Sequence, residues 1–171
     1  MKRMLSFGLL VLLCTAQLCA QDIVGKWQSK YAAKDIDHAV VNYTFNADKT
    51  CQLTVDAGLS KDGKSSTVVF KIFFSIDGNY EIKDNKLTLD YKPESMKTDF
   101  DFDIKGDGLD EDKVKMLRPL LKQAIDAKKD EMVGRLTESY RQSTLKIVSA
   151  DKQQLKLEDK DGNQIVADRV K

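Results

Sequence analysis

Apolar and polar residues alternate with a period of two along most of this chain, which is the pattern of half-buried β-strands. The first two clear strands flank a polar turn at residues 46–49. Their apolar faces consist of Val41, Tyr43 and Phe45 in one strand and Cys51, Leu53 and Val55 in the other. This spacing predicts a β-hairpin.

The segment Thr67–Ser75 differs from these strands because it is apolar on both faces. One face carries Val68, Phe70, Ile72 and Phe74, and the other carries Val69 and Phe73. Alternation alone does not determine which of these faces points inward.

Two further hairpins follow, with turns at residues 84–86 and 150–152, and Asp161-Gly162 supplies residues that tolerate positive φ before a last strand. We expect about eight to ten strands, all consecutive and antiparallel, since no strand–helix–strand pattern occurs. Closing such a meander into an up-and-down antiparallel β-barrel leaves no exposed edge strand. The predicted fold is therefore a mainly β barrel.

An insertion over about residues 94–140 interrupts the meander before the last strands. Apolar residues alternate with aspartates over residues 99–104, and a helical segment then extends across residues 110–139. Its apolar positions recur at helical spacing: Val114, Leu117, Leu121, Ile125, Met132 and Leu136. Because Pro119 lacks a backbone donor, we expect either a helix that ends near Leu117 followed by a second helix, or one kinked helix.

Residues 1–20 have the order of a secretory signal peptide, with a basic start, an apolar run and a small-residue exit. We expect this segment to be removed and residues 21–171 to form one exported domain, periplasmic or secreted. The apolar run is shorter than the roughly 20 residues of a membrane-spanning helix, so no transmembrane segment is expected. Leu18 stands before Cys19, where a lipoprotein signal needs a small residue, so we do not expect lipid anchoring there.

Charge and cysteine content narrow the functional classes. The chain has a net charge of +1, and losing two of its 28 basic residues with the signal, while keeping all 27 acidic ones, leaves −1. So small a charge gives no attraction to nucleic acid. Only Cys51 of the three cysteines lies outside the signal, so no internal disulfide is expected. Its place in an alternating strand predicts a buried apolar residue rather than a reactive thiol.

The sequence contains no recognisable catalytic or metal-binding motif. His38 is the single histidine, which excludes a histidine-based metal cluster, and we expect it in an exposed loop. No nucleophile elbow, paired-cysteine motif or phosphate-binding loop occurs. Asp99, Asp101 and Asp103 share one strand face without the spacing of a calcium loop, which predicts a solvated acidic face. We therefore expect no enzyme activity, no metal and no cofactor.

The segment Ile23-Val24-Gly25-Lys26-Trp27 places a Gly-x-Trp motif on the first strand of an exported meander. Residues 77–89 and 155–170 contain further short sequence motifs that support the same resemblance. These features resemble the lipocalins and are most similar to small lipocalin-like proteins exported by bacteria of the Bacteroidetes kind. The resemblance implies that Trp27 closes one end of the barrel and that Arg169 packs across it, where a guanidinium over an indole gains cation–π energy. The chain departs from the family in lacking its usual disulfides and in carrying the helical insertion.

A barrel of about eight strands either fills its interior with side chains or keeps a pocket for one small ligand. Tyr91 is expected to point inward, and the helical stripe would cover an open barrel end. The candidate ligand-binding residues are Tyr43, Phe70, Phe74, Tyr80, Leu89, Leu117 and Leu121.

Two hypotheses follow. The first is a non-enzymatic protein that binds a small hydrophobic molecule, such as a lipid or fatty acid, in the barrel. The second is an envelope protein–protein interaction module with a solid barrel and the insertion as its contact surface; its protein partner is not identified by the sequence.

Overall fold

The computed structural model describes residues 23–33, 36–62, 67–105 and 111–171, which form nine strands and two α-helices. In chain order the elements are β1 (Gly25–Ala33), β2 (Ile36–Phe45), β3 (Thr50–Asp62), β4 (Thr67–Lys83), β5 (Lys86–Tyr91), the 3-10 turn η1 (Pro93–Ser95), β6 (Lys97–Lys105), α2 (Glu111–Asp126), α3 (Lys129–Ser139), β7 (Gln142–Ala150), β8 (Gln154–Glu158) and β9 (Gln164–Arg169). The expected signal peptide, residues 1–20, lies outside the described residues.

Eight of these strands close into a barrel. Neighbouring strands follow the order β3-β2-β1-β9-β8-β7-β5-β4, and β4 pairs with β3 to complete the ring. Every ladder is antiparallel and joins strands that follow one another around the barrel. The predicted up-and-down barrel is therefore confirmed, as is the helical insertion before the last strands.

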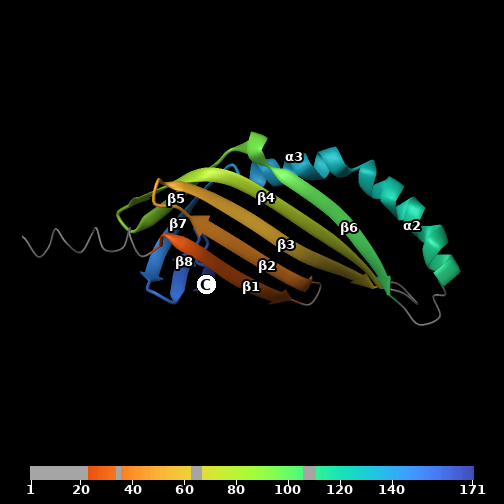
Figure 1. The fold of residues 1–171 in the computed structure, drawn as a ribbon, viewed down its shortest axis with the longest axis horizontal. Helices are drawn as coiled ribbons and strands as arrows, with labels where there is room; N and C mark the ends of the chain where they lie inside the picture. Colours follow the sequence, from red (N-terminus) through yellow and green to blue (C-terminus); the bar gives the residue numbers. More distant parts are fainter. Residues whose placement is uncertain (1–22, 34–35, 63–66, 106–110) are drawn as a thin grey trace, which may run out of the picture.

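Strand β4 is long enough to pair with two different strands along one of its edges. Its first part, Thr67–Ser75, pairs with β6, and its last part, from Gly78, pairs with β5. The sequence pattern treats these parts as separate strands, but their inward alternation is continuous through Phe74, Ile76 and Tyr80. As a result β3, β4 and β6 extend beyond the barrel, as Figure 1 shows.

One end of the barrel is filled by large side chains. Trp27 is fully buried there, and its indole Nε1 donates a 2.7 Å hydrogen bond to the carbonyl oxygen of Ile23. The guanidinium carbon of Arg169 lies 4.2 Å from the Trp27 ring centroid, and Arg169 Nη1 donates to the carbonyl of Val24 at 3.0 Å. We call this the closed end; it also contains the tight β4–β5 turn.

The insertion forms β6 and two helices, but its break differs from the sequence expectation. Helix α2 runs through Pro119 without ending, and the interruption falls at Ala127–Lys128, before α3. The sequence does not predict a break at Ala127–Lys128, because the helical spacing of apolar residues continues from α2 into α3. In Figure 1 both helices follow the course of β6. None of the helices in the described ranges has the length and apolarity to cross a membrane.

The helical stripe packs mainly on the extended sheet rather than over the barrel end. Leu121 and Ile125 face Phe70 and Phe102 across a small pocket, and the guanidinium of Arg118 lies 5.3 Å from the Phe102 ring centroid. The expectation that the stripe covers the barrel end therefore holds only where α3 ends. The barrel end and the extended sheet are both apolar, so the sequence does not show on which of them the helices pack.

Candidate functional site

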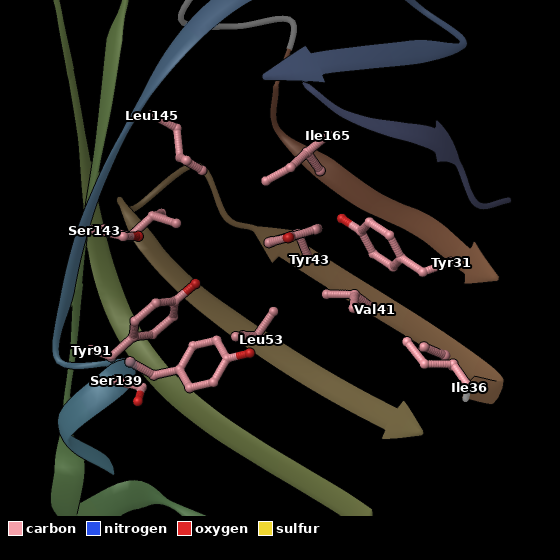
Figure 2. A pocket seen from close by; sticks show the side chains of 13 residues that line it. Tyr31, Ile36, Val41, Tyr43, Leu53, Tyr91, Ser139, Ser143, Leu145 and Ile165 are labelled. Carbon is pink, nitrogen blue, oxygen red and sulfur yellow. The ribbon is translucent and has the colours of Figure 1, made fainter. Parts of the chain in front are cut away.

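The barrel contains a cavity of about 550 Å³ at the end opposite Trp27. Side chains from six strands and from the junction between α3 and β7 line it. Figure 2 shows the labelled side chains around this space. The lining residues are Tyr31, Ile36, Ala39, Val41, Tyr43, Leu53, Leu89, Tyr91, Ser139, Tyr140, Ser143, Leu145 and Ile165. We call this space the barrel cavity.

The cavity exists because the inward positions change in size along the strands. At the closed end they include Trp27, Phe45 and Tyr80, and Phe45 meets Tyr80 edge-on with ring centroids 5.1 Å apart. Toward the other end, the strands present small inward residues such as Ala39 and Ser143. The barrel is thus packed at one end and hollow at the other, which favours the alternative of a barrel that keeps a pocket over that of a filled one.

The end of α3 covers part of the cavity. Tyr140, the residue after α3, lies against Phe74 with ring centroids 5.0 Å apart, and Leu136 packs on the same barrel core. The Ser139 hydroxyl donates to the carbonyl of Arg135 at 2.8 Å, within the helix. The insertion therefore contributes side chains to the cavity through its last turn.

Three of the cavity's phenols are held in their neutral form by burial. Burial, assisted by the neighbouring phenols of Tyr31 and Tyr140, raises the pKa of Tyr43 above its usual value. Burial likewise raises the pKa of Tyr91 and of Tyr140. These hydroxyls stay protonated across the physiological range, so each can both donate and accept a hydrogen bond.

The structure divides the predicted ligand-binding residues into three groups. Tyr43 and Leu89 line the barrel cavity, and Phe74 lies beside it under Tyr140. Tyr80 lies at the closed end, where its hydroxyl donates to the carbonyl of Asn46 at 2.8 Å. It is outside the cavity because β4 runs from the cavity end of the barrel toward the closed end, and Tyr80 lies near the end of this strand.

The remaining three predicted residues lie on or near the insertion. Phe70 and Leu121 face each other in a second pocket of about 190 Å³ between the helices and the extended sheet. Leu117 is 41% exposed on α2. They are separated from the barrel cavity because β4 and β6 extend past it.

Sequence reasoning also missed several lining residues. Tyr31 continues the inward alternation of Trp27 and Ser29 in β1, so the period of two would have found it. Tyr140 gives no such signal, because it follows the end of a helix and its position depends on how the insertion returns to β7.

His38 lies on β2 and not in a loop, which corrects the sequence expectation. Its ring nitrogens are 3.3 Å from Asp37 and 3.1 Å from Asp56, so it reaches across to β3 on the outer face. Hydrogen bonds to Asp56 and then Asp37 raise the pKa of His38 above 6.5. Within the described ranges, no group of three or more histidine, cysteine, aspartate and glutamate side chains is placed to hold a metal ion.

Cys51 and the aspartates of β6 agree with their predictions. Cys51 is buried, and burial raises the pKa of its thiol to about 11, so it is not poised for reaction. Asp99 and Asp101 are exposed on the outer face, and Asp103 forms an ion pair with Lys71.

An eight-stranded up-and-down barrel with an internal cavity defines a lipocalin-like fold. No protein-family model matches this sequence, and no curated protein matches it.

Two solved structures are similar to the chain. A lipocalin-like protein from Bacteroides uniformis is 18% identical, covering 87% of this chain and 99% of that one, with a TM-score of 0.37. An uncharacterized protein from Bacteroides eggerthii is 15% identical, covering 86% and 98%, with a TM-score of 0.36. At these scores the fold assignment rests on the strand ladders described above.

Proposed function

We propose that this protein binds a small hydrophobic molecule in the barrel cavity without catalysing a reaction on it. The observation that carries the proposal is the cavity itself. Its volume of about 550 Å³ lies in the range of roughly 300–1,000 Å³ typical of small-molecule sites. Its lining is mostly aliphatic and aromatic, as such sites require.

The chemistry of the lining supports binding over catalysis. Among the described residues that line the cavity there is no histidine, cysteine, carboxylate or basic side chain. His38 lies on the outer face of β2, and Cys51 is not among the lining residues. General acid–base chemistry needs a titratable group within reach of the substrate, and burial keeps the Tyr43, Tyr91 and Tyr140 hydroxyls neutral.

The same proposal includes export. Residues 1–20 have the composition of a secretory signal, and residue 21 onward would work in the periplasm or outside the cell. The mass of the protein isolated from its own cell envelope should correspond to a chain starting at Gln21. A mass that includes residues 1–20 would contradict export by this signal.

The test of binding is native mass spectrometry of the exported protein, followed by organic extraction of whatever is bound. We expect a discrete adduct that extracts into organic solvent. The Ser143→Phe variant places a ring in the cavity and should lose the adduct. Thr144→Phe adds the same ring on the opposite, exposed face of β7 and should keep it.

Circular dichroism should show that both variants are folded. Equal adduct in the two variants would place the ligand outside the barrel cavity. No adduct in the parent protein, together with no uptake of apolar probes, would contradict the proposal.

A second candidate function rests on helix α2. Met116 is 74% exposed and Leu120 is 63% exposed, beside the half-exposed Leu117. Apolar side chains gathered on one exposed helix can form a contact with a protein partner. The Met116→Ser, Leu120→Ser double variant should then abolish cross-linking to that partner in the envelope while leaving the barrel adduct unchanged.

A further inference from the structure

The polar side chains that the described residues present to the barrel cavity all carry hydroxyl groups. Of the 13 lining residues, seven are aliphatic and two are serines. The other four are Tyr31, Tyr43, Tyr91 and Tyr140. Four of the chain's five tyrosines therefore meet in one apolar space, which gives it polar contacts without charge.

The tyrosines converge on one another from different elements. Tyr31 comes from β1, Tyr43 from β2 and Tyr91 from β5. In Figure 2 the hydroxyl of Tyr31 points toward Tyr43, and the hydroxyl of Tyr91 points into the space. A ligand group that enters here meets several hydroxyls that can donate or accept.

The basic side chains that adjoin lining residues in the described chain are directed elsewhere: Lys30 and Lys92 are exposed, and Lys146 pairs with Glu158. Arg141 follows Tyr140 but lines a separate surface pocket with Pro93 and Glu138. Arg169 stacks on Trp27 at the closed end. A carboxylate placed among the described lining residues would lose its hydration without gaining a cation, and such burial is strongly unfavourable.

We infer that the barrel cavity selects an uncharged apolar molecule bearing a hydroxyl, carbonyl or ester group over an anionic fatty acid of the same length. This inference rests on the proposed function and narrows its ligand class. The aliphatic lining takes the hydrocarbon part, and the tyrosine hydroxyls take the neutral polar group.

The test compares three probes that share a ten-carbon chain and differ in their polar group: decan-1-ol, methyl decanoate and decanoate. Isothermal titration calorimetry at pH 7.5 should show the alcohol and the ester binding at least tenfold more tightly than the carboxylate, which corresponds to about 1.4 kcal/mol. Decanoate affinity should rise as the pH is lowered toward 5, because the protonated acid is neutral.

Conservative variants test the tyrosines directly. Tyr43→Phe and Tyr91→Phe each remove one cavity hydroxyl and keep the ring, so decan-1-ol affinity should fall about threefold to tenfold. Tyr80→Phe is the matched control: its hydroxyl binds Asn46 at the closed end, and affinity should not change. An equal effect in all three variants would contradict the role of the cavity hydroxyls.

The outcomes separate this inference from the proposed function. Decanoate binding as tightly as decan-1-ol at pH 7.5, in a protein that still carries an extractable adduct, would overturn the inference alone. No binding of any probe and no adduct would overturn both.

Lys34 lies outside the described residues, so the calorimetry is repeated with the Lys34→Gln variant. Decanoate binding that disappears in this variant would identify Lys34 as a cation for the carboxylate and would overturn the inference.

Discussion

The side chain of Arg169 extends from the last strand to the first and leaves no room for a side chain at Gly25. Gly25 has φ of 138°, a conformation that side chains disfavour, and a Cβ there would lie 2.5 Å from Arg169 Nη1. The guanidinium cannot retreat without leaving Trp27 and the Val24 carbonyl. The glycine is therefore required by both backbone and packing.

Gly25→Ala should destabilise the protein by about 1–3 kcal/mol, because it adds backbone strain and displaces Arg169. The measurement is urea denaturation followed by fluorescence of Trp27, the only tryptophan. Gly134→Ala is the control: Gly134 lies in α3, and apart from its chain neighbours and the helix's own backbone no atom lies within 4 Å of the added carbon, so stability should rise by about 0.5–1 kcal/mol. Equal stability of Gly25→Ala and the parent would contradict this reading.

His38 should give a pH-dependent contribution to stability. Its pKa in the folded state is raised above 6.5, so the stabilisation is complete below the unfolded value and is lost as pH rises through the folded value. Because the side chain is 37% exposed, the effect should be small and weakened by salt.

Nuclear magnetic resonance can follow this titration without assignment, since the chain has one histidine. Asp56→Asn should lower the pKa more than Asp37→Asn, because the bond to Asp56 is the larger cause. A pKa of His38 at or below 6.5 in the parent protein would count against the arrangement.

At the scale of elements, α2 keeps a proline that helices usually avoid. Pro119 lies inside α2 and offers no N–H to the carbonyl four residues earlier. Pro119→Ala should restore this hydrogen bond and stabilise α2 locally by up to about 3 kcal/mol.

Hydrogen exchange should therefore slow in α2 and remain unchanged in the barrel strands, because α2 packs on the sheet extension. Lys122→Ala, on the exposed side of the same helix, should leave exchange nearly unchanged. Faster exchange in α2 after Pro119→Ala would mean that the proline is needed for its packing.

The elements that the sequence predicted well are those determined by residues close together in the chain, such as turn residues and alternating strand positions. The β4–β5 hairpin is one example: Asp84 and Asn85 adopt φ of 52° and 59°, and apolar alternation flanks them. The docking of α2 has no local cause, because Leu121 would suit either the barrel end or the Phe70 surface. The same reason explains the site: Tyr43 and Leu89 follow from strand alternation, whereas Tyr140 depends on the path of the insertion.

At the scale of the whole molecule, the first and last strands of the barrel meet in its shortest ladder. Strands β1 and β9 pair only at Trp27 with Arg169 and at Gln28 with Asp168. Beyond these pairs, the Ser29 hydroxyl donates to the carbonyl of Val166 at 2.7 Å. The β3–β4 ladder, by contrast, extends from Thr50 to Asp62.

Ser29→Ala should therefore weaken the contact between β1 and β9 and lower the free energy of unfolding by about 1 kcal/mol. Amides of β9 should exchange faster, while those of β3 keep the parent rate; hydrogen exchange with mass spectrometry measures both. Ser75→Ala, half-buried on β4, is the control and should leave β9 unchanged. Unchanged exchange in β9 of Ser29→Ala would show that the backbone hydrogen bonds between β1 and the C-terminal segment suffice without the Ser29 hydroxyl.

The two ends of the described chain lie together at the closed end. Ile23 accepts the Trp27 hydrogen bond there, and the Val170 N–H donates to the carbonyl of Lys26 at 2.9 Å. The cavity lies at the opposite end. A linker attached at either terminus would therefore hold the molecule on a sensor surface with its mouth toward the solution, and the immobilised protein should take up ligand as the free protein does.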